Sequence, residues 1–587
     1  MESTSSGSAN SPSANLVSDQ GAKAPRSYWF ALAFISMGVT MVMIDATIVN
    51  VAIPQVTADL NLQPTDILWI NSIYALVFAA LLISMGKLAD SIGRRLVFVL
   101  GVAIFVIASL IAALAPSGEV IIAGRAIQGV GGAMMITASL SLLNSMFRGK
   151  DRAIAFAIWG AMVGTVAALG PLLGGFLTSE YSWRWAFAIN VPIAVVSIAG
   201  ALALAPEAKD TTSKRGLDLP GVLLSALGLG ALIFALIQGQ VFGWWAPKNP
   251  DLAIGAISWP LTSISPVPVA LLISVVSITA FVVVERRRAS ADKVYTLDLD
   301  LFKVRTFAWG NLTGLCIMFG EFGIILTLPI YLQNGLGFSA LKAGCTTAFI
   351  MVGALLAAPA SGRLTQAKGP MFVVRTGLLI EGLAMAAVGL TYAPDTSQWA
   401  YVPWLALFGV GVGLGTAQLV NVILRDVPVD KSGQASGTQS TSRQVGTALG
   451  VAILGAVLWT SLGSTLTADL QQPQVGLSAQ EAQKVADSIV ASSGVTINAN
   501  AEAVPPQELI GATYGPAVQQ AAEDAFARST AAATYVGAGF VLLGLLATLG
   551  RTRRREDADG GANPADSSTG HASSGTTQRA SSSTVSV

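Results

Sequence analysis

The sequence predicts an all-α membrane protein, and three observations support this fold class. Hydrophobic residues make up 53% of the 587 residues and charged residues only 11%, whereas a soluble protein is about 25% charged. Fourteen apolar runs each have the roughly 20 residues that a helix needs to cross a bilayer. The runs are continuous, whereas the strands of a membrane barrel alternate between apolar and polar residues. We therefore expect fourteen transmembrane helices.

The distribution of Lys and Arg agrees with this number of spans. When the N-terminus is placed in the cytoplasm, 28 of the 34 Lys and Arg residues fall in cytoplasmic segments and five in outside loops, while Arg125 lies within the fourth span. Cytoplasmic loops characteristically carry such an excess of positive charge. A missed span would invert the pattern after it, so the bias predicts that both termini are cytoplasmic. The expected spans are residues 28–54, 67–86, 95–115, 120–146, 153–178, 185–206, 217–238, 267–284, 306–333, 341–361, 372–392, 400–424, 436–460 and 531–550.

Loop lengths divide these spans into two bundles of six helices with a two-helix hairpin between them. Two long basic joints, 207–216 and 285–305, flank the hairpin at 217–284. The N-terminal bundle is expected at 28–206 and the C-terminal bundle at 306–550. Membrane transporters are often built from such repeated bundles.

Three further segments lie outside the spans. The extracytoplasmic loop 461–530 is rich in Ala, Gln and Ser, with a helical stretch near 479–492, and has too few large apolar residues for a core of its own. The terminal segments 1–27 and 551–587 are polar and of low complexity, so we expect both tails to be disordered.

A weak internal repeat supports the two bundles. The first span carries Asp45 and, nine residues later, Pro54, while the ninth span carries Glu321 and, eight residues later, Pro329. Each bundle thus begins with a helix that has one acid and one late proline. The loop after the second span contains an acid, and the corresponding loop after the tenth span, the second span of the C-terminal bundle, has none.

The loop after the second span contains the residues of a tight turn between two helices. Glycines permit a compact backbone, and an acid there can bond N–H groups at a helix end or an arginine. Such a loop can act as a latch that holds one state of a moving bundle, or it can be a plain turn. The residues of this latch are Gly86, Asp90, Gly93, Arg94 and Arg95.

Polar residues in the first and fourth spans indicate a charged site inside the membrane. Arg125 and Gln128 are three positions apart, so they share a face of the fourth helix. An arginine in the membrane is costly unless it is paired. The first span offers Asp45, Thr47 and Asn50 as polar groups in an otherwise apolar helix.

The fifth span carries a stripe of small residues with a proline. Small residues on one helix face let a second helix approach closely. The stripe either serves general helix packing or forms a specialised motif of exchange transporters. Its residues are Gly164, Gly170, Pro171, Gly174 and Gly175.

Taken together, these motifs resemble the major facilitator superfamily. The loop Gly86–Arg95 is similar to its signature G-x-L-a-D-r-x-G-r-r, although Ser91 stands where the family usually has a basic residue. The fourth span resembles its R-x-x-Q-G motif, and Gly164–Gly175 resembles its antiporter motif. The first span resembles the pattern l-D-x-T-i-v-N-v-A-l-P of the fourteen-span drug:proton antiporters of EmrB/QacA type. The resemblance implies the major-facilitator fold of two six-helix bundles with an inserted hairpin.

Proton coupling is expected at acids inside the spans. Burial and a nearby cation shift the proton affinity of a carboxyl group in opposite directions, so such an acid can bind and release protons. Asp45 is expected to pair with Arg125 when it has no proton, while Glu321 and Glu381 offer further sites. A permanent Asp45–Arg125 ion pair that only fixes packing is the alternative, and Glu381 can equally be a packing group.

A substrate cavity is expected between the bundles. A large apolar cavity with one or two acids suits lipophilic cations. Aromatic residues also anchor helices at the membrane interface, which is the alternative role for those in this set. The candidates are Thr47, Asn50, Tyr74, Gln128, Trp159, Trp309, Asn311 and Phe322.

These expectations converge on proton-driven efflux of amphipathic or cationic drugs and toxic compounds across a bacterial cytoplasmic membrane. The resemblance implies a monomer that needs no metal or other cofactor, and whose partners are a small lipophilic molecule, protons and the lipid bilayer. The net charge of +1 gives no reason to expect nucleic acid as a partner. A dedicated exporter of one endogenous metabolite, antibiotic, peptide or lipid would show the same features. A membrane enzyme is disfavoured because the single histidine, His571, lies in the polar tail.

Overall fold

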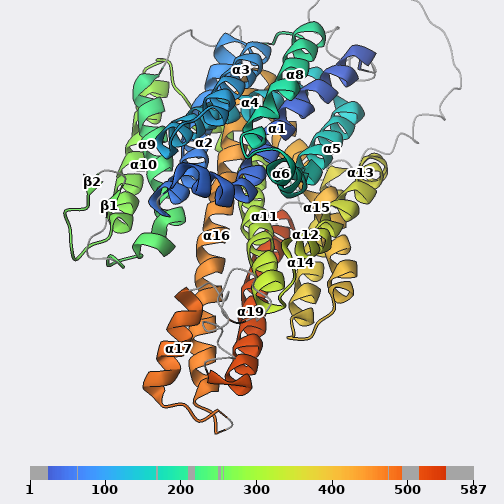
Figure 1. Ribbon diagram of the computed structural model, residues 1–587. Helices are drawn as coiled ribbons and strands as arrows, with labels where there is room; N and C mark the ends of the chain where they lie inside the picture. Colours follow the sequence, from blue (N-terminus) through green and yellow to red (C-terminus); the bar gives the residue numbers. More distant parts are fainter. Residues whose placement is uncertain are drawn as a thin grey trace, which may run out of the picture.

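The computed structural model is almost entirely helical (Figure 1). The expected disordered tails, 1–27 and 551–587, lie outside the described residues except for residues 24–27, of which Arg26 and Ser27 already belong to the first helix. The structure describes residues 24–62, 64–166, 169–208, 218–248, 253–254, 257–473, 475–491, 497 and 514–549.

Within the described residues, eight helices precede the first long joint, and they make up the upper part of the molecule in Figure 1. They are α1 (Arg26–Leu60), α2 (Pro64–Ile92), α3 (Arg94–Ala113), α4 (Gly118–Met146), α5 (Gly149–Val166), α6 (Leu169–Glu180), α7 (Trp185–Ala188) and α8 (Asn190–Leu204).

The next elements form a hairpin that lies along one flank of the molecule (Figure 1). They are α9 (Leu219–Phe242), the antiparallel strands β1 (Ala253–Ile254) and β2 (Ile257–Ser258), α10 (Pro266–Ser290) and the short 3-10 helix η2 (Leu299–Lys303).

The remaining elements form the other long helical group. They are α11 (Arg305–Ile330), the π-helix η3 (Tyr331–Gly335), α12 (Ala340–Thr347), α13 (Phe349–Lys368), α14 (Pro370–Thr391), α15 (Gln398–Arg425), η4 (Val429–Lys431), α16 (Ser432–Leu470), α17 (Ala479–Ala491) and α19 (Pro516–Leu549).

The predicted all-α membrane fold is confirmed. Among the described residues, twelve helices are long and apolar enough to cross a membrane, and a thirteenth candidate is bent by 44° beside Pro359. Proline explains this bend because it lacks an N–H donor for the preceding turn. The fifth expected span coincides with two helices, α5 and α6, and residues 167–168 between them lie outside the description.

Several helices extend well beyond the expected limits of their spans. The helix α16 continues to Leu470, and α19 begins at Pro516, so much of the expected loop 461–530 is helical. The predicted helix near 479–492 is confirmed as α17. Buried side chains of α16 and α17 pack together there, within the same hydrophobic cluster that runs through the helix bundles.

This core consists of one face from each helix. Leu462, Leu466 and Leu470 recur every four residues on α16, and Val485 and Ile489 do so on α17. All five are nearly inaccessible to solvent. Such a face is hard to identify from composition, because each helix contributes only a narrow apolar stripe. Figure 1 places α17 beside the far end of α16.

A capping box defines where α17 begins. Ser478 Oγ accepts from the backbone N–H of Glu481 at 3.3 Å, and Glu481 Oε2 accepts from the backbone N–H of Ser478 at 3.1 Å. The Ser478 hydroxyl also donates to Glu481 Oε2. Together these bonds satisfy N–H groups that a helix start leaves free.

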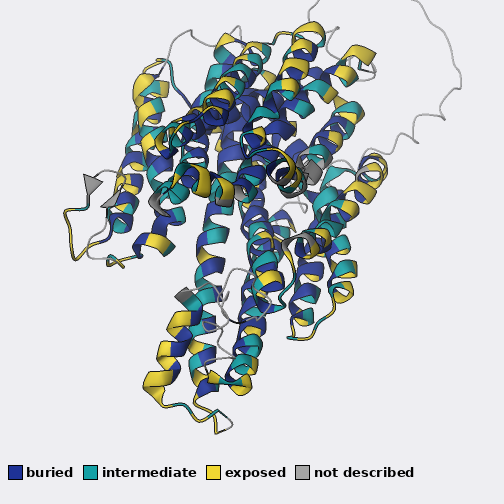
Figure 2. Ribbon diagram, viewed as in Figure 1, coloured by how far each residue is buried: buried dark blue, intermediate teal, exposed yellow. Residues whose placement is uncertain are grey.

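The long helix α16 connects the helical groups. It contacts α2, α4 and α9 on one side and α11 and α19 on the other. The hairpin packs through α9 against α2, with α10 behind it. Buried residues line the faces that meet in the interior, and exposed residues cover the outer faces, as Figure 2 shows.

Two pairs of helices are joined by single glycines with positive φ. Gly93 separates α2 from α3 with φ of 125°, and Gly369 separates α13 from α14 with φ of 83°. Only glycine adopts such a backbone without strain. The two joints occupy the positions that the internal repeat aligns.

Candidate functional site

A buried ion pair lies among the first group of helices. Asp45 of α1 is fully buried, and Arg125 of α4 is 1% exposed. Arg125 Nη1 donates to Asp45 Oδ2 and, at 3.0 Å, to Gln128 Oε1. Arg125 Nε donates to the carbonyl of Ile70 in α2 at 3.2 Å. Three acceptors on three helices therefore hold the guanidinium, which offsets the cost of burying its charge.

The other oxygen of Asp45 is also satisfied. Asp45 Oδ1 accepts from Gln128 Nε2 at 2.8 Å and from Asn190 Nδ2 of α8 at 3.0 Å. The same two amides donate to Ser109 Oγ of α3, at 2.8 and 3.1 Å. We call Asp45, Arg125, Gln128, Ser109 and Asn190 the Asp45 cluster; it joins α1, α3, α4 and α8.

Sequence reasoning missed Ser109 and Asn190. Asn190 is a polar amide in an apolar run, and this was a usable signal. Ser109 gave none, because a serine inside a helix commonly bonds its own backbone, as Ser109 Oγ does to the carbonyl of Phe105. Its place against two amides depends on how α3 is rotated about its axis.

An aromatic ring covers the guanidinium. The ring of Tyr74 on α2 lies 4.3 Å from Arg125 Cζ, and it stacks on Phe78. This is a cation–π contact inside the protein. The face of Tyr74 is therefore occupied by Arg125, and another cation can use it only after Arg125 has moved.

Two further acids lie in the last group of helices. Glu321 of α11 is 7% exposed and accepts a hydrogen bond of 3.0 Å from Thr416 Oγ1 of α15. Arg443 of α16 interacts electrostatically with it. Glu381 of α14 is fully buried, and within the described structure neither of its oxygens has a hydrogen-bond partner. Glu321 and Glu381 also interact electrostatically with each other, so these acids form one coupled group.

The loop predicted as a latch connects α2 with the start of α16. Asp90 is fully buried, its Oδ1 accepts from the N–H of Gly433 at 2.8 Å, and its Oδ2 accepts from the N–H of Gln434 at 2.9 Å. A carboxylate there also interacts favourably with the positive end of the helix dipole. A Cβ on Gly86 would overlap the carbonyl of Gly433, so the two backbones touch.

Arginines on the next helix complete the latch. Arg94 is 2% exposed; its Nη2 donates to Asp90 Oδ1 at 3.0 Å and to the carbonyl of Val429. The backbone N–H of Arg95 donates to Glu207 Oε1 at 3.2 Å. Our expectation of a loop needs correction, because α2 runs through Asp90 to Ile92 and only Gly93 separates it from α3.

Three more hydrogen bonds join the two helical groups near the latch. Asn144 Nδ2 of α4 donates to Ser432 Oγ at 2.7 Å. Arg152 Nε of α5 donates to Asn421 Oδ1 at 3.0 Å. Gln418 Nε2 of α15 donates to the carbonyl of Ala153 at 3.1 Å. Together with Asp90, they close this end of the molecule between α2, α4, α5, α15 and α16.

The glycine motif places α6 directly against α1. A Cβ on Gly170 would overlap Thr47 Oγ1, and a Cβ on Gly174 would lie 3.2 Å from the carbonyl of Ile48. A Cβ on Gly175 would meet nothing within 4 Å. Thr47 donates to backbone carbonyls of its own helix, so its hydroxyl is used locally. Thr47 is therefore a packing contact of α6 in this structure.

The other predicted cavity residues are dispersed. Trp159 and Asn311 are 5% and 4% exposed, and Asn311 Nδ2 donates to the carbonyl of Phe307. Phe322 is half-buried. Trp309 is 46% exposed. The side-chain surroundings of Asn50, Gly164 and Pro171 lie outside the description.

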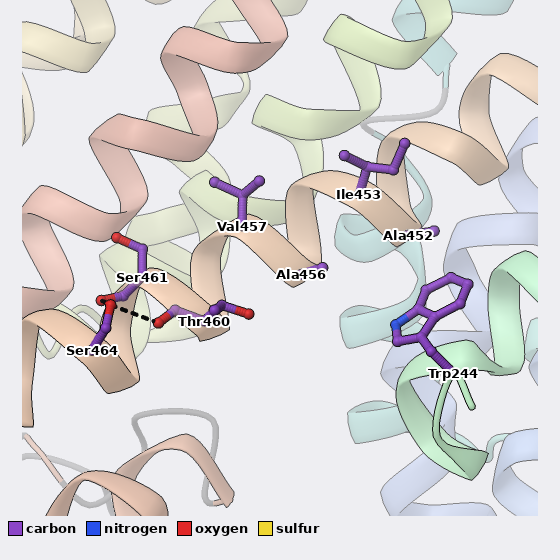
Figure 3. A pocket seen from close by; sticks show the side chains of 8 residues that line it. All are labelled: Trp244, Ala452, Ile453, Ala456, Val457, Thr460, Ser461 and Ser464. Carbon is purple, nitrogen blue, oxygen red and sulfur yellow. Dashed lines mark hydrogen bonds between the residues drawn. The ribbon is translucent and has the colours of Figure 1, made fainter. Parts of the chain in front are cut away.

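An open groove lies between Trp244, which follows α9, and one face of α16 (Figure 3). Its volume is about 670 Å³. The face is apolar near Trp244 and carries hydroxyl groups farther along. The α16 residues that line it are Ala452, Ile453, Ala456, Val457, Thr460, Ser461 and Ser464. No predicted cavity residue is among them.

Comparison of the sequence with models of protein families identifies the family of this chain. The model of the Major Facilitator Superfamily matches residues 35–451, from α1 to the middle of α16. The chain belongs to this superfamily. It is accordingly a multi-pass membrane transporter that handles small molecules, rather than an enzyme.

Similar proteins are bacterial. The chain is 34% identical to the "Probable actinorhodin transporter" of Streptomyces coelicolor, over 75% of this chain and 74% of that protein. It is 30% identical to the "Multidrug resistance protein Stp" of Mycobacterium tuberculosis, over 76% of this chain and 79% of that protein.

A solved structure supports the fold. The crystal structure of the human organic anion transporter MFSD10 (TETRAN) aligns with a TM-score of 0.54 at 14% identity. The alignment covers 89% of this chain and all of that chain. At this identity the likeness shows the major-facilitator fold and nothing about substrate.

Proposed function

We propose that the protein exports amphipathic or cationic drugs across a bacterial cytoplasmic membrane in exchange for protons. The observation that carries the proposal is the Asp45 cluster, an acid and an arginine enclosed within the helices of a transporter. A buried ionisable pair of this kind in a membrane protein usually marks an ion pathway. Relatives whose names describe drug resistance and antibiotic transport support export as the direction.

In the proposed exchange, a proton and Arg125 compete for Asp45. In the proposed proton-free form, the carboxylate keeps the hydrogen bonds from Arg125, Gln128 and Asn190 that this structure has. A proton on Asp45 removes the charge that holds the guanidinium. The cluster then carries a net positive charge, which disfavours a cationic substrate, so proton and substrate occupy the cavity in turn, as exchange requires. The membrane potential supplies about 2.3 kcal/mol per charge per 100 mV.

We place the latch end at the cytoplasm. The bias of Lys and Arg toward the same side of the membrane supports this orientation. The structure is then closed to the cytoplasm, and loading from that side requires Asp90 to leave Gly433 and Gln434. We divide the chain, as the loop lengths suggest, into bundles at 28–206 and 306–550 with a hairpin between them, and we propose that a single chain is the working unit.

Glu321 and Glu381 are proposed as a second proton site. A fully buried carboxyl without partners is stable only when it is neutral or when a cation joins it. Glu381 meets this description, and Glu321 has Thr416 and Arg443 to balance its charge. Movement of Arg443 with α16 would therefore change which of the two acids holds a proton.

A dedicated exporter of one antibiotic is the second candidate. It is favoured by the 34% identity to a protein named for actinorhodin alone. The same cluster, latch and glycine motif would serve either substrate range, so the breadth of substrates decides between them.

Proton release from everted membrane vesicles, acidified inside, tests the proposal. Ethidium, a quaternary ammonium compound and neutral antibiotics are added in turn, and a pH-sensitive dye reports loss of the gradient. Several unrelated cations should give a response that Asp45→Asn abolishes. Asp59→Asn is the matched control, because Asp59 lies at the exposed end of the same helix and pairs with Arg184.

The outcomes separate the candidates. A response to one compound class alone favours the dedicated exporter. A response that survives Asp45→Asn contradicts the proposed role of Asp45 and assigns coupling to Glu321 and Glu381. No response to any compound, with correctly inserted protein, contradicts multidrug export.

A further inference from the structure

Two buried carboxylates lie together at the base of the α9–α10 hairpin, outside the transport site proposed above. Asp218 immediately precedes α9 and is 3% exposed, and Glu285 lies near the end of α10 and is 1% exposed. Both contact the segment that follows α10 and leads to η2. This segment connects the hairpin with the last helical group.

Both carboxylates accept hydrogen bonds from the backbone of the same segment. The N–H of Thr296 donates to Asp218 Oδ2 at 3.1 Å and to Glu285 Oε2 at 2.9 Å. The Thr296 hydroxyl donates to Asp218 Oδ2, and the N–H of Leu297 donates to Glu285 Oε2, both at 3.1 Å. One N–H shared by two carboxylates requires their oxygens to be close neighbours.

One oxygen of this pair has no partner. Glu285 Oε1 is buried, and the described residues provide no hydrogen bond to it. A Cβ on Gly221 would overlap both Glu285 Oε1 and Asp218 Oδ2, so these two oxygens face the same small space beside the Gly221 backbone. A buried carboxylate oxygen that faces a second carboxylate lacks a donor, and a single proton between the two would supply it.

The positive charges near the two carboxylates balance only one of them. Arg288 Nε lies 3.0 Å from Asp218 Oδ1, which balances one of the two carboxylates. Among the other described cations near this segment, Lys87 of α2 lies over the ring of Tyr295, Lys431 pairs with Asp298, and Arg286, Arg287 and Lys293 are exposed. With both acids ionised, one buried negative charge would therefore remain unbalanced, at a cost of several kcal/mol.

We propose that Asp218 and Glu285 bind one proton between them, with Glu285 as the donor and Asp218 as the acceptor. This proton removes the repulsion between the acids and holds residues 291–298 on the base of the hairpin. The site is separate from the Asp45 cluster, and its proton is not the one that is transported.

Residues 291–298 also contact the latch. The N–H of Asp298 donates to Gln434 Oε1 at 2.8 Å, and the N–H of Gln434 donates to Asp90 Oδ2. The acid pair and the latch therefore act on the same first turn of α16. Loss of the proton drives the carboxylates apart, loosens the segment and weakens the support of the closed end.

Hydrogen exchange of the full-length protein in lipid nanodiscs tests this site without any transport assay. Exchange of peptides that cover residues 291–304 is followed from neutral to mildly alkaline pH and corrected for the intrinsic exchange rate. Release of one proton lets protection fall by at most about tenfold per pH unit. Glu285→Gln, whose amide donates to Asp218 as the proton does, should keep protection high and independent of pH.

Asp300→Asn is the matched control, because Asp300 is an exposed acid of the adjoining η2 and should leave the pH dependence unchanged. Protection that does not depend on pH in the natural protein, or dependence that persists in Glu285→Gln, overturns the proposal. Recovery of protection on addition of Na⁺ or Ca²⁺ at alkaline pH would identify a cation site instead. If Glu285→Gln fails to fold, Asp218→Asn and the infrared band of the protonated carboxyl provide the same test.

Discussion

We expect Asp90→Asn to shift the protein away from the state in which the latch end is closed. Asp90 accepts from the N–H groups of Gly433 and Gln434, whereas an asparagine keeps one acceptor and turns its amide NH₂ toward the other donor. A hydrogen bond to a charged group contributes about 1.5–3 kcal/mol, so the change costs about 2–3 kcal/mol of the closed state. Since 1.4 kcal/mol is a factor of ten, the ratio of closed to open molecules should fall roughly 30- to 150-fold.

The distance between two spin labels measures this ratio. Labels on Lys150→Cys and Lys368→Cys report on α5 and α13, which lie in contact near the latch and on which both lysines are exposed. The two natural cysteines, Cys316 and Cys345, are free and are replaced first. Double electron–electron resonance of the purified protein should show a short distance between the two labels in the natural sequence and mainly a longer distance in Asp90→Asn.

The control for this experiment is Asp300→Asn, which removes an exposed carboxylate paired only with Lys303. It should leave the distance distribution unchanged. An unchanged distribution in Asp90→Asn would refute the reasoning, because it would mean that the two N–H bonds do not contribute to closure. A change of equal size in both variants would point to a general effect of surface charge.

Three further predictions concern other parts of the structure. Arg125→Met should lower stability by about 3–5 kcal/mol, because it leaves a buried carboxylate unpaired, and Asp45→Asn in the same chain should recover most of the loss in thermal unfolding. Equal instability with and without Asp45→Asn would contradict this. Gly170→Ala should cost about 1–3 kcal/mol by overpacking against α1, whereas Gly175→Ala should be neutral, and equal effects on melting temperature would disprove the close contact. The hydrogen bonds from Ser478 hold the pKa of Glu481 below its ordinary value of 4.5, so they stabilise the start of α17 above that pH. The hydrogen-exchange rate in α17, corrected for the intrinsic rate, should therefore rise as the pH falls through the lowered pKa. Glu481→Gln should remove this pH dependence.

Much of the fold could be predicted because it depends on local sequence. Hydropathy located each span near a helix, since an apolar run of this length is stable across a bilayer only as a helix. The two helix ends that were placed worst, those of α16 and α19, extend beyond the apolar runs. The extra turns of α16 pack against α17, and α16 and α19 pack against each other, which no local property of α16 or α19 could indicate.

The candidate site was only partly predictable. Asp45, Arg125 and Gln128 stood out because charged and amide groups are rare inside membrane helices. Their pairing with Ser109 and Asn190 depends on which faces of α3 and α8 turn inward.

From the sequence we could predict a helical membrane transporter, the approximate places of its spans, and the motifs that resemble those of a known superfamily. These properties follow from hydropathy and from short motifs that lie within one or two helices. Only the folded molecule shows that Asp90 closes on Gly433 and Gln434, that no described residue bonds the Glu381 carboxyl, and that Asp218 and Glu285 share Thr296. Such pairs come from helices far apart in the chain, and only the packing of those helices selects which buried polar groups meet.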